Sequence, residues 1–253
     1  KFSSIKAGDQ IIKLTMRIGA HLGRFITAEV GTARRMERVL LGSTLHQTRA
    51  AETAGERGRV SVTPMMQQRI QAQFKIDEGR EGFGLVADEL NETAGGGFEI
   101  SPPTRRLARA GALFSRDRVE LLRSLTQELA EAEALACYLP RPFLNKIVDT
   151  LPDHRIVSSF LQPTVLFLNL LGFSSALDVA APVEAAVVTD AFSHAFTRIN
   201  EAVEARGGVL KKVTSYLQGS DVMILFGVPE AGPDDVKNAI ISDRAIRNIV
   251  EEQ

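Results

Sequence analysis

The stretch TVLFLNLLGF, residues 164–173, decides how we expect this chain to fold. Its first seven residues are an uncharged, β-prone run with the length of a buried strand, and Gly172 interrupts that run. A helix-favouring segment follows from about Pro182 to Ala205, and the glycine pair at 207 and 208 ends it in the usual manner of a helix C-terminus. We therefore expect a buried strand followed by a long helix.

Two more strands and a closing helix are expected after this glycine pair. The runs VLKKVTSYL and VMILFG are β-prone and are separated by a turn at 219–221, and residues 234–250 have a helical pattern. The order strand, helix, strand, strand, helix is that of a split βαβ sandwich that lacks its final strand. The expected fold class is therefore α+β and ferredoxin-like, with a helical linker before this block.

The missing final strand has a structural consequence for the strand at 164–170. In a split βαβ sandwich the final strand lies beside the first, so without it the first strand keeps an unpaired edge. Residues 14–21 are a strand of the same type and could close that edge in a permuted domain. We expect instead that a segment outside residues 1–253 completes the sheet.

The first hundred residues predict a mixture of strands and helices. Two β-prone runs within residues 14–31 are split by Leu22 and Gly23, which predicts a tight hairpin. A helix is expected at 45–54, a short strand at 59–62, and a second helix from Pro64, where proline favours the first helical turn, to Ile70. The segment is expected to end where glycines and prolines cluster at 93–103.

A helical linker is expected between the two blocks. Apolar residues fall alternately three and four positions apart over residues 119–139, which predicts a helix whose narrow seam fits either its own domain or a second chain. Prolines 140 and 142 end that helix, and residues 143–151 predict another short one. We therefore divide the chain into residues 1–100, a linker at 101–160, and residues 161–253.

Composition excludes several classes of partner and site. The chain has 253 residues with 30 basic and 31 acidic side chains, and this balance gives no electrostatic reason to expect nucleic acid or an anionic membrane as a partner. Its apolar runs fall short of a bilayer span. Because Cys137 is the single cysteine, no internal disulfide and no cysteine-based zinc site are expected, and we expect the protein in the cytoplasm.

Several motifs resemble a known family. The stretches VLFLNLLGFS (165–174) and QGSDVMILFGVP (218–229), followed by DDVKNAI, resemble the first half of a class III nucleotidyl cyclase domain, the adenylate and guanylate cyclase family. The stretch MRIGAHLGRFITAEVGTARRMERVLLGSTLHQTRAAE (16–52) resembles the second half of such a domain. A second half followed by a first half is similar to a window from a degenerate tandem cyclase of bacterial type. The resemblance implies that residues 1–100 are a C-terminal half and residues 161–253 an N-terminal half, and that both ends lie inside a longer protein.

The resemblance also implies where metal ions would bind. In the family, two aspartates hold two ions, Mg²⁺ or Mn²⁺, that activate the ribose 3′-hydroxyl for attack on the α-phosphate. The first aspartate position holds Asn169, a neutral and weak magnesium ligand, and the second holds Ser220. Asp221 comes one residue late, and a one-residue shift turns a strand side chain to the opposite face. Asp221 would still reach a metal if the longer segment before it shifts the turn.

The remaining catalytic positions implied by the resemblance are also substituted. The transition-state asparagine position is His46 and the arginine position is Ala50, while Arg49 lies one residue early and points about 100° away on the helix. The implied nucleotide-binding positions are Val39, Tyr216 and Phe173. Val39 and Tyr216 cannot imitate the lysine and the polar partner that read adenine.

These substitutions lead to three functional hypotheses. The first is a degenerate cyclase-homology segment that acts as a regulatory or dimerisation module and needs no metal. The alternative is an active nucleotidyl cyclase that converts ATP or GTP to a cyclic nucleotide through Asp221, Asn169 and Arg49, with Mg²⁺ or Mn²⁺ as its cofactor. The third is a nucleotide sensor without turnover. In each, the expected partner is a second cyclase-homology domain, in cis or in trans.

Overall fold

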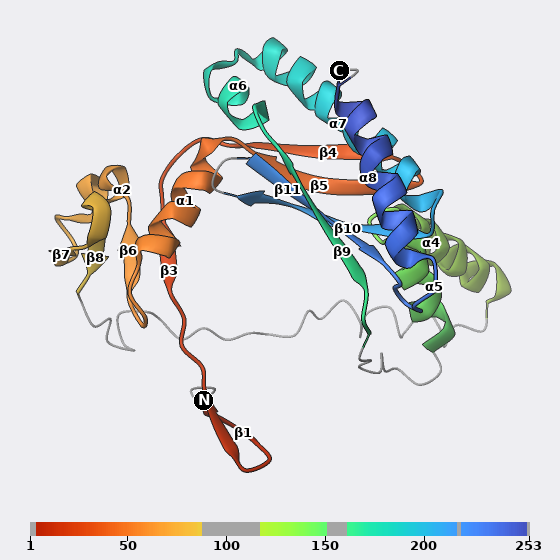
Figure 1. Cartoon of the computed structure of the whole chain (residues 1–253), viewed down its shortest axis with the longest axis horizontal. Coiled ribbons are helices and arrows are strands. Elements are labelled where there is room, and N and C mark those ends of the chain that lie inside the picture. The colour runs from red at the N-terminus through yellow and green to blue at the C-terminus, as the bar shows by residue number, and fades with distance from the viewer. Residues whose placement is uncertain (1–3, 88–116, 151–160, 217–218, 252–253) are drawn as a thin grey trace. The chain divides into compact units, whose positions relative to one another are not determined.

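The computed structural model describes residues 4–87, 117–150, 161–216 and 219–251 (Figure 1). The chain divides into two compact units, the first made of residues 1–31, 37–88 and 160–253 and the second of residues 32–36 and 89–159. The boundary that the sequence predicts near residue 100 lies outside the described residues. The content of helices and of several sheets is compatible with the α+β class.

The secondary structure follows a mixed order along the chain. The strands are β1 (Ser4–Ala7), β2 (Gln10–Lys13), β3 (Ile18–Ala20), β4 (Ile26–Thr32), β5 (Arg35–Leu41), β6 (Val60–Val62), β7 (Ile76–Glu78), β8 (Gly84–Val86), β9 (Thr164–Leu170), β10 (Gly208–Tyr216) and β11 (Gly219–Phe226). The helices are α1 (Ser43–Ala54), α2 (Pro64–Ile70), the 3₁₀ turn η1 (Arg80–Gly82), α4 (Arg118–Ala136), α5 (Arg141–Thr150), α6 (Phe173–Val179), α7 (Pro182–Glu204) and α8 (Asp235–Glu251).

The strand predicted at 164–170 is confirmed as β9, and it forms a three-stranded sheet in the order β10-β11-β9. Both pairings are antiparallel. Helices α7 and α8 pack against this sheet (Figure 1), and their positions confirm the two long helices that the sequence predicts. The side chains of Val222, Ile224 and Phe226 alternate along β11 and are fully buried in the core that the helices cover.

Segments from the two ends of the sequence share this core. Buried residues of β4 and β5, among them Val30 and Leu41, belong to the same hydrophobic cluster as those of β11 and α7. Hydrogen bonds also join the segments: Gly31 N donates to Ser193 Oγ at 3.0 Å, and Ser43 N donates to Asp178 Oδ1 at 2.9 Å. The first unit is therefore built from both ends of the sequence.

The hairpin predicted within residues 14–31 is wrong. Strand β3 pairs in parallel with β6, whereas β4 pairs with β5 around a turn at Ala33 and Arg34. Gly23 serves close packing and not a turn, because a Cβ there would lie 2.8 Å from His21 Nε2 and would overlap Thr44 Oγ1 of α1. From the sequence alone, a glycine that allows close packing could not be distinguished from a glycine that forms a turn.

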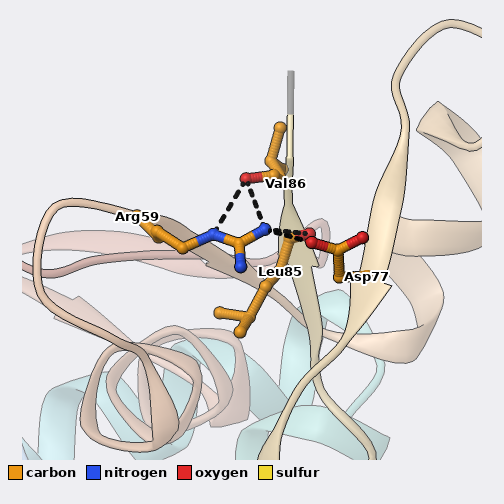
Figure 2. Close-up of polar contacts among 4 residues, drawn as sticks. All are labelled: Arg59, Asp77, Leu85 and Val86. Atoms are coloured by element: carbon orange, nitrogen blue, oxygen red, sulfur yellow. Dashed lines mark hydrogen bonds and ion pairs between the residues drawn. The ribbon is translucent and has the colours of Figure 1, made fainter. Parts of the chain in front are cut away.

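Arg59, just before β6, adds side-chain contacts to β7 and β8 within the sheet β3-β6-β8-β7 (Figure 2). One guanidinium nitrogen, Nη2, lies 2.7 Å from Asp77 Oδ2 on β7 and donates to the carbonyl oxygens of Leu85 and Val86 on β8 at 3.3 and 3.2 Å. The Arg59 side chain is 29% exposed, so solvent screens this pairing only in part. This arginine fixes the short β7-β8 hairpin to the rest of the sheet.

In the second unit, the turn between β4 and β5 contacts the C-terminal end of α4. Met36 N donates to Cys137 O at 2.7 Å, and the buried Arg35 donates from Nη1 to the carbonyl of Tyr138. A cation beside the last carbonyls of a helix complements the negative end of the helix dipole. The helices that the sequence predicts at 119–139 and 143–151 are confirmed as α4 and α5. None of the helices in the described ranges is long and apolar enough to cross a membrane.

Candidate functional site

Asn169 and Asp221 lie side by side on neighbouring strands. The antiparallel register of β9 and β11 places the two residues directly opposite each other, and Asn169 Nδ2 donates a hydrogen bond to Asp221 Oδ1 at 2.7 Å. Ser220 pairs with Leu170 instead, and its side chain is buried on the other face of the sheet. Of the two arrangements left open by the sequence, the structure has the one in which Asp221 reaches the side of Asn169.

Gly219 explains how the Asn169 amide is oriented. A Cβ at Gly219 would lie 2.5 Å from the carbonyl oxygen of Leu170 and would overlap Asn169 Oδ1. Glycine therefore lets the amide oxygen approach the β11 backbone, and the amide nitrogen is left facing Asp221. The Asn169 side chain presents a donor to the carboxylate, which is the opposite polarity to the one a cation between the two residues would need.

This donor set does not fit a pair of divalent cations. Two ions bridged by the site would need two carboxylates, whereas Asn169, Ser220 and Asp221 supply one carboxylate, one amide that already donates to it, and one buried hydroxyl. Elsewhere in the described ranges, no three or more His, Cys, Asp or Glu side chains gather in a metal-binding arrangement.

His46, Arg49 and Ala50, at or beside the transition-state positions that the resemblance implies, lie on α1. Arg49 is exposed, and its Nη1 lies 3.3 Å from Glu52 Oε2, while Arg17 Nη2 lies 3.2 Å from Glu52 Oε1. Both carboxylate oxygens of Glu52 are therefore occupied by arginines. His46 is half-buried one helical turn before Arg49. Helix α1 is positioned by Gly19 on β3, where a Cβ would lie 2.7 Å from the Cα of Glu52.

A cavity of about 610 Å³ is lined by residues of α1 and by residues of the sheet that carries Asn169 and Asp221. Its lining includes Arg49 and Val39 from the first segment and Thr214 from β10. Thr214 pairs with Asp221, which pairs with Asn169, so the three residues form one row across the sheet. Residues of the segments 16–52 and 165–240 thus come to one region of the first unit, although they are far apart in sequence.

Most of the side chains at the predicted nucleotide-binding positions pack against other residues of the protein. Val39 is 2% exposed within the core cluster, so it offers little surface to a ligand. The Phe173 ring packs edge-on against Phe192, with ring centroids 5.1 Å apart and an interplanar angle of 84°. Tyr216 pairs with Gly219 at the end of β10, and its side chain is outside what the structure describes.

A larger cavity, of about 980 Å³, contains none of the predicted site residues. It is bordered by the N-terminal end of α1, the start of β4, and helices α6 and α7. His21 lies in its wall and is hydrogen-bonded through Nδ1 to Thr63 Oγ1 at 2.8 Å. Asp178 also lines it and accepts from Ser43 N, and no pattern in the sequence pointed to that capping contact.

Comparison with known proteins gives no assignment. The sequence matches no protein-family model, and no curated protein matches it.

Proposed function

We propose that this chain is a degenerate class III nucleotidyl cyclase-homology segment that acts as a regulatory or dimerisation module in a signalling protein. The proposal rests on the motif resemblance in residues 16–52 and 165–240 together with one observation, the hydrogen bond from Asn169 to Asp221. This bond commits Asn169, at the first implied metal-ligand position, and Asp221, one residue after the second, to each other. The order β10-β11-β9 is compatible with the first three strands of a ferredoxin-like sandwich.

The side chains at and beside the positions that would stabilise a transition state are also either paired with another residue or too short to reach a phosphate. Arg49 is paired with Glu52, and Ala50, at the family's arginine position, has no side chain that could reach a phosphate. Negative charge that develops on a phosphoryl group in the transition state is stabilised by hydrogen-bond donors that already point towards it. A segment with these substitutions retains a scaffold suited to contacting another domain, and this supports the regulatory role over turnover.

One observation favours the alternative of an active cyclase with atypical ligands. Asp221 lies on the same side as Asn169, and the adjacent Thr214 lines a cavity that also holds Arg49 and Arg17. A carboxylate beside an arginine-lined cavity is an arrangement that could bind a metal–nucleotide complex if the Asn169 amide turned over. The same geometry supports the third hypothesis, nucleotide binding without turnover.

Turnover by the purified 253-residue chain tests the proposal. The chain is incubated with ATP or GTP and millimolar Mn²⁺ or Mg²⁺, and cyclic nucleotide is quantified by chromatography beside the Asp221→Asn variant. We expect equal, background-level product from both proteins. Product that is formed by the wild-type chain and lost in Asp221→Asn would establish the active alternative.

Calorimetric titration with the same nucleotides separates the regulatory module from the sensor. We expect no measurable heat of binding at submillimolar nucleotide, because Arg49 and Arg17 both contact Glu52. Saturable binding without product would identify a nucleotide sensor and would contradict the first proposal.

A further inference from the structure

The cavity of about 610 Å³ beside α1 carries an excess of positive charge. Three arginines line it, Arg17, Arg38 and Arg49. Among the described residues, Glu52 supplies the single carboxylate of this lining. Arg38 Nε donates to Glu29 Oε1 at 2.6 Å, but Glu29 does not line the cavity. Because a cleft lined by charge of one sign concentrates counter-ions, the cavity has the electrostatics of an anion-binding site.

The carboxylate of Glu52 is the anion that these arginines contact within the chain. Gly19 lets α1 lie close against β3, and this packing brings Glu52 beside Arg17. Arg17 Nη2 lies 3.2 Å from Glu52 Oε1, and Arg49 Nη1 lies 3.3 Å from Glu52 Oε2. One carboxylate of the protein therefore bridges two guanidinium groups that come from different elements.

Glu52 fits this bridging position poorly. Charge-assisted hydrogen bonds between a guanidinium and a carboxylate are usually about 2.7–2.9 Å long, and both contacts of Glu52 are longer. Arg49 makes no other hydrogen bond or ion pair among the described residues, so most of its N–H donors stay available. The Arg17 and Arg49 side chains are 42% and 52% exposed, and ion pairs of this kind contribute little to stability. Displacing the Glu52 carboxylate therefore costs little.

The remaining lining of the cavity includes an apolar surface. It is formed by Ile18, Leu40, Leu45 and Val213. Ile18 and Leu40 are 44% and 41% exposed, so a ligand can still remove apolar area there from water. Pockets of this kind combine apolar walls with a few polar groups that fix the orientation of the ligand. The lining therefore favours an anionic group that carries an apolar substituent.

We propose that this cavity binds a phosphate monoester with an apolar substituent, and that Glu52 holds the phosphate position until the ligand displaces it. A phosphate monoester carries about −1.5 to −2 charges at neutral pH and offers three acceptor oxygens. It can therefore bridge Arg17 and Arg49 and also use the donors of Arg49 that Glu52 leaves available. The substituent lies against Ile18 and Leu40. The ion pairs and the cavity carry this inference, which is independent of the cyclase resemblance.

Calorimetric titration of the purified chain with phenyl phosphate, at constant ionic strength, tests the proposal. We expect weak, saturable binding to the wild type. Glu52→Gln removes the competing charge and should bind phenyl phosphate about tenfold more tightly. Glu56→Gln removes the same charge from an exposed residue outside the cavity, and it should leave the affinity unchanged. Far-UV circular dichroism verifies that each variant keeps its fold.

Benzoate and a second substitution separate this site from general attraction to positive charge. Benzoate has the same ring with a carboxylate in place of the phosphate, so it should bind much more weakly than phenyl phosphate. Arg49→Gln should abolish saturable binding of phenyl phosphate both in the wild type and in Glu52→Gln, because it removes one of the two bridged guanidinium groups. The wild-type measurement keeps the test valid if Glu52→Gln does not fold.

Four outcomes overturn the proposal. They are the absence of saturable phenyl phosphate binding to a folded Glu52→Gln chain, equal affinity of the wild type and Glu52→Gln, an equal gain in Glu56→Gln, and benzoate binding as tight as that of phenyl phosphate. The probe contains neither a nucleotide nor a metal ion. These outcomes are therefore distinguishable from those of the turnover and nucleotide-binding experiments.

Discussion

The substitution Asn169→Asp replaces the amide that donates to Asp221 with a second carboxylate. Two charges about 3 Å apart repel by about 1.4 kcal/mol in water and by about 5.5 kcal/mol at an effective dielectric constant of about 20. Because Asn169 is exposed and Asp221 is half-buried, the cost should lie towards the lower figure after the side chains separate. The lost hydrogen bond to a charged group adds about 1.5 kcal/mol. We therefore expect the free energy of unfolding to fall by about 2–3 kcal/mol.

Urea unfolding followed by circular dichroism, in a chelator-containing buffer and at one protein concentration, measures this change. The variant Asn169→Asp/Asp221→Asn exchanges the two side chains and restores one donor and one carboxylate, so it should recover most of the loss. Millimolar Mn²⁺ should stabilise Asn169→Asp, where two carboxylates can share the ion, and leave the wild type unchanged. If Asn169→Asp is as stable as the wild type without metal, the two residues do not interact as described.

Three further substitutions test the packing around the site, each by urea unfolding. Gly19→Ala forces α1 away from β3 because the new Cβ would lie 2.7 Å from the Cα of Glu52, and it should cost about 1–3 kcal/mol; Gly232→Ala, with its nearest contact at 3.5 Å, should be near neutral. Asp178→Ala removes the acceptor for Ser43 N at the start of α1 and should cost about 1 kcal/mol, whereas an unchanged stability would exclude a capping role. Arg59→Met should cost about 1–2 kcal/mol by releasing β7 and β8, and clearly more than Arg247→Met in the exposed pair with Asp243.

Periodicity predicted the elements of the last block well because each has one dominant physical signal. The apolar run of β9 is confirmed from Thr164 to Leu170, and the predicted helix at 182–205 is confirmed as α7, Pro182–Glu204. Proline at the start and glycine after the end bound α7 on both sides. Elements whose ends are set by local chemistry are the ones that a single sequence can delimit.

The strand pairing of the first block could not be predicted in the same way. Gly23 resembles a turn residue, but its role is to let Thr44 of α1 approach, and that contact depends on the tertiary structure. The actual turn, at Ala33 and Arg34, contains neither glycine nor asparagine; Gly31, at a φ of 108°, takes the unusual backbone conformation two residues earlier. Local sequence therefore predicted strands that correspond to β3, β4 and β6, but it predicted neither the other strands of this block nor which strands pair.

Counting residues along the motif could not predict on which face of the sheet Asp221 lies. Counting assigned Ser220 to the metal side and turned Asp221 away, because side chains alternate along a strand. The register between β9 and β11 reverses that assignment by pairing Asp221 with Asn169 and Ser220 with Leu170. The register of β11 depends on where the β10-β11 turn lies. When the segment before that turn has an altered length, the sequence does not show on which face of the sheet each β11 side chain lies, and only the observed strand pairing does.

The way the two segments join bears on what a module of this kind can do. Two hydrogen bonds span 162 and 135 residues of sequence, and the buried residues they accompany belong to one hydrophobic cluster. The buried residues of β4, β5, β11 and α7 thus stabilise one another within this chain. A partner would then be selected by surfaces that this shared core leaves uncovered.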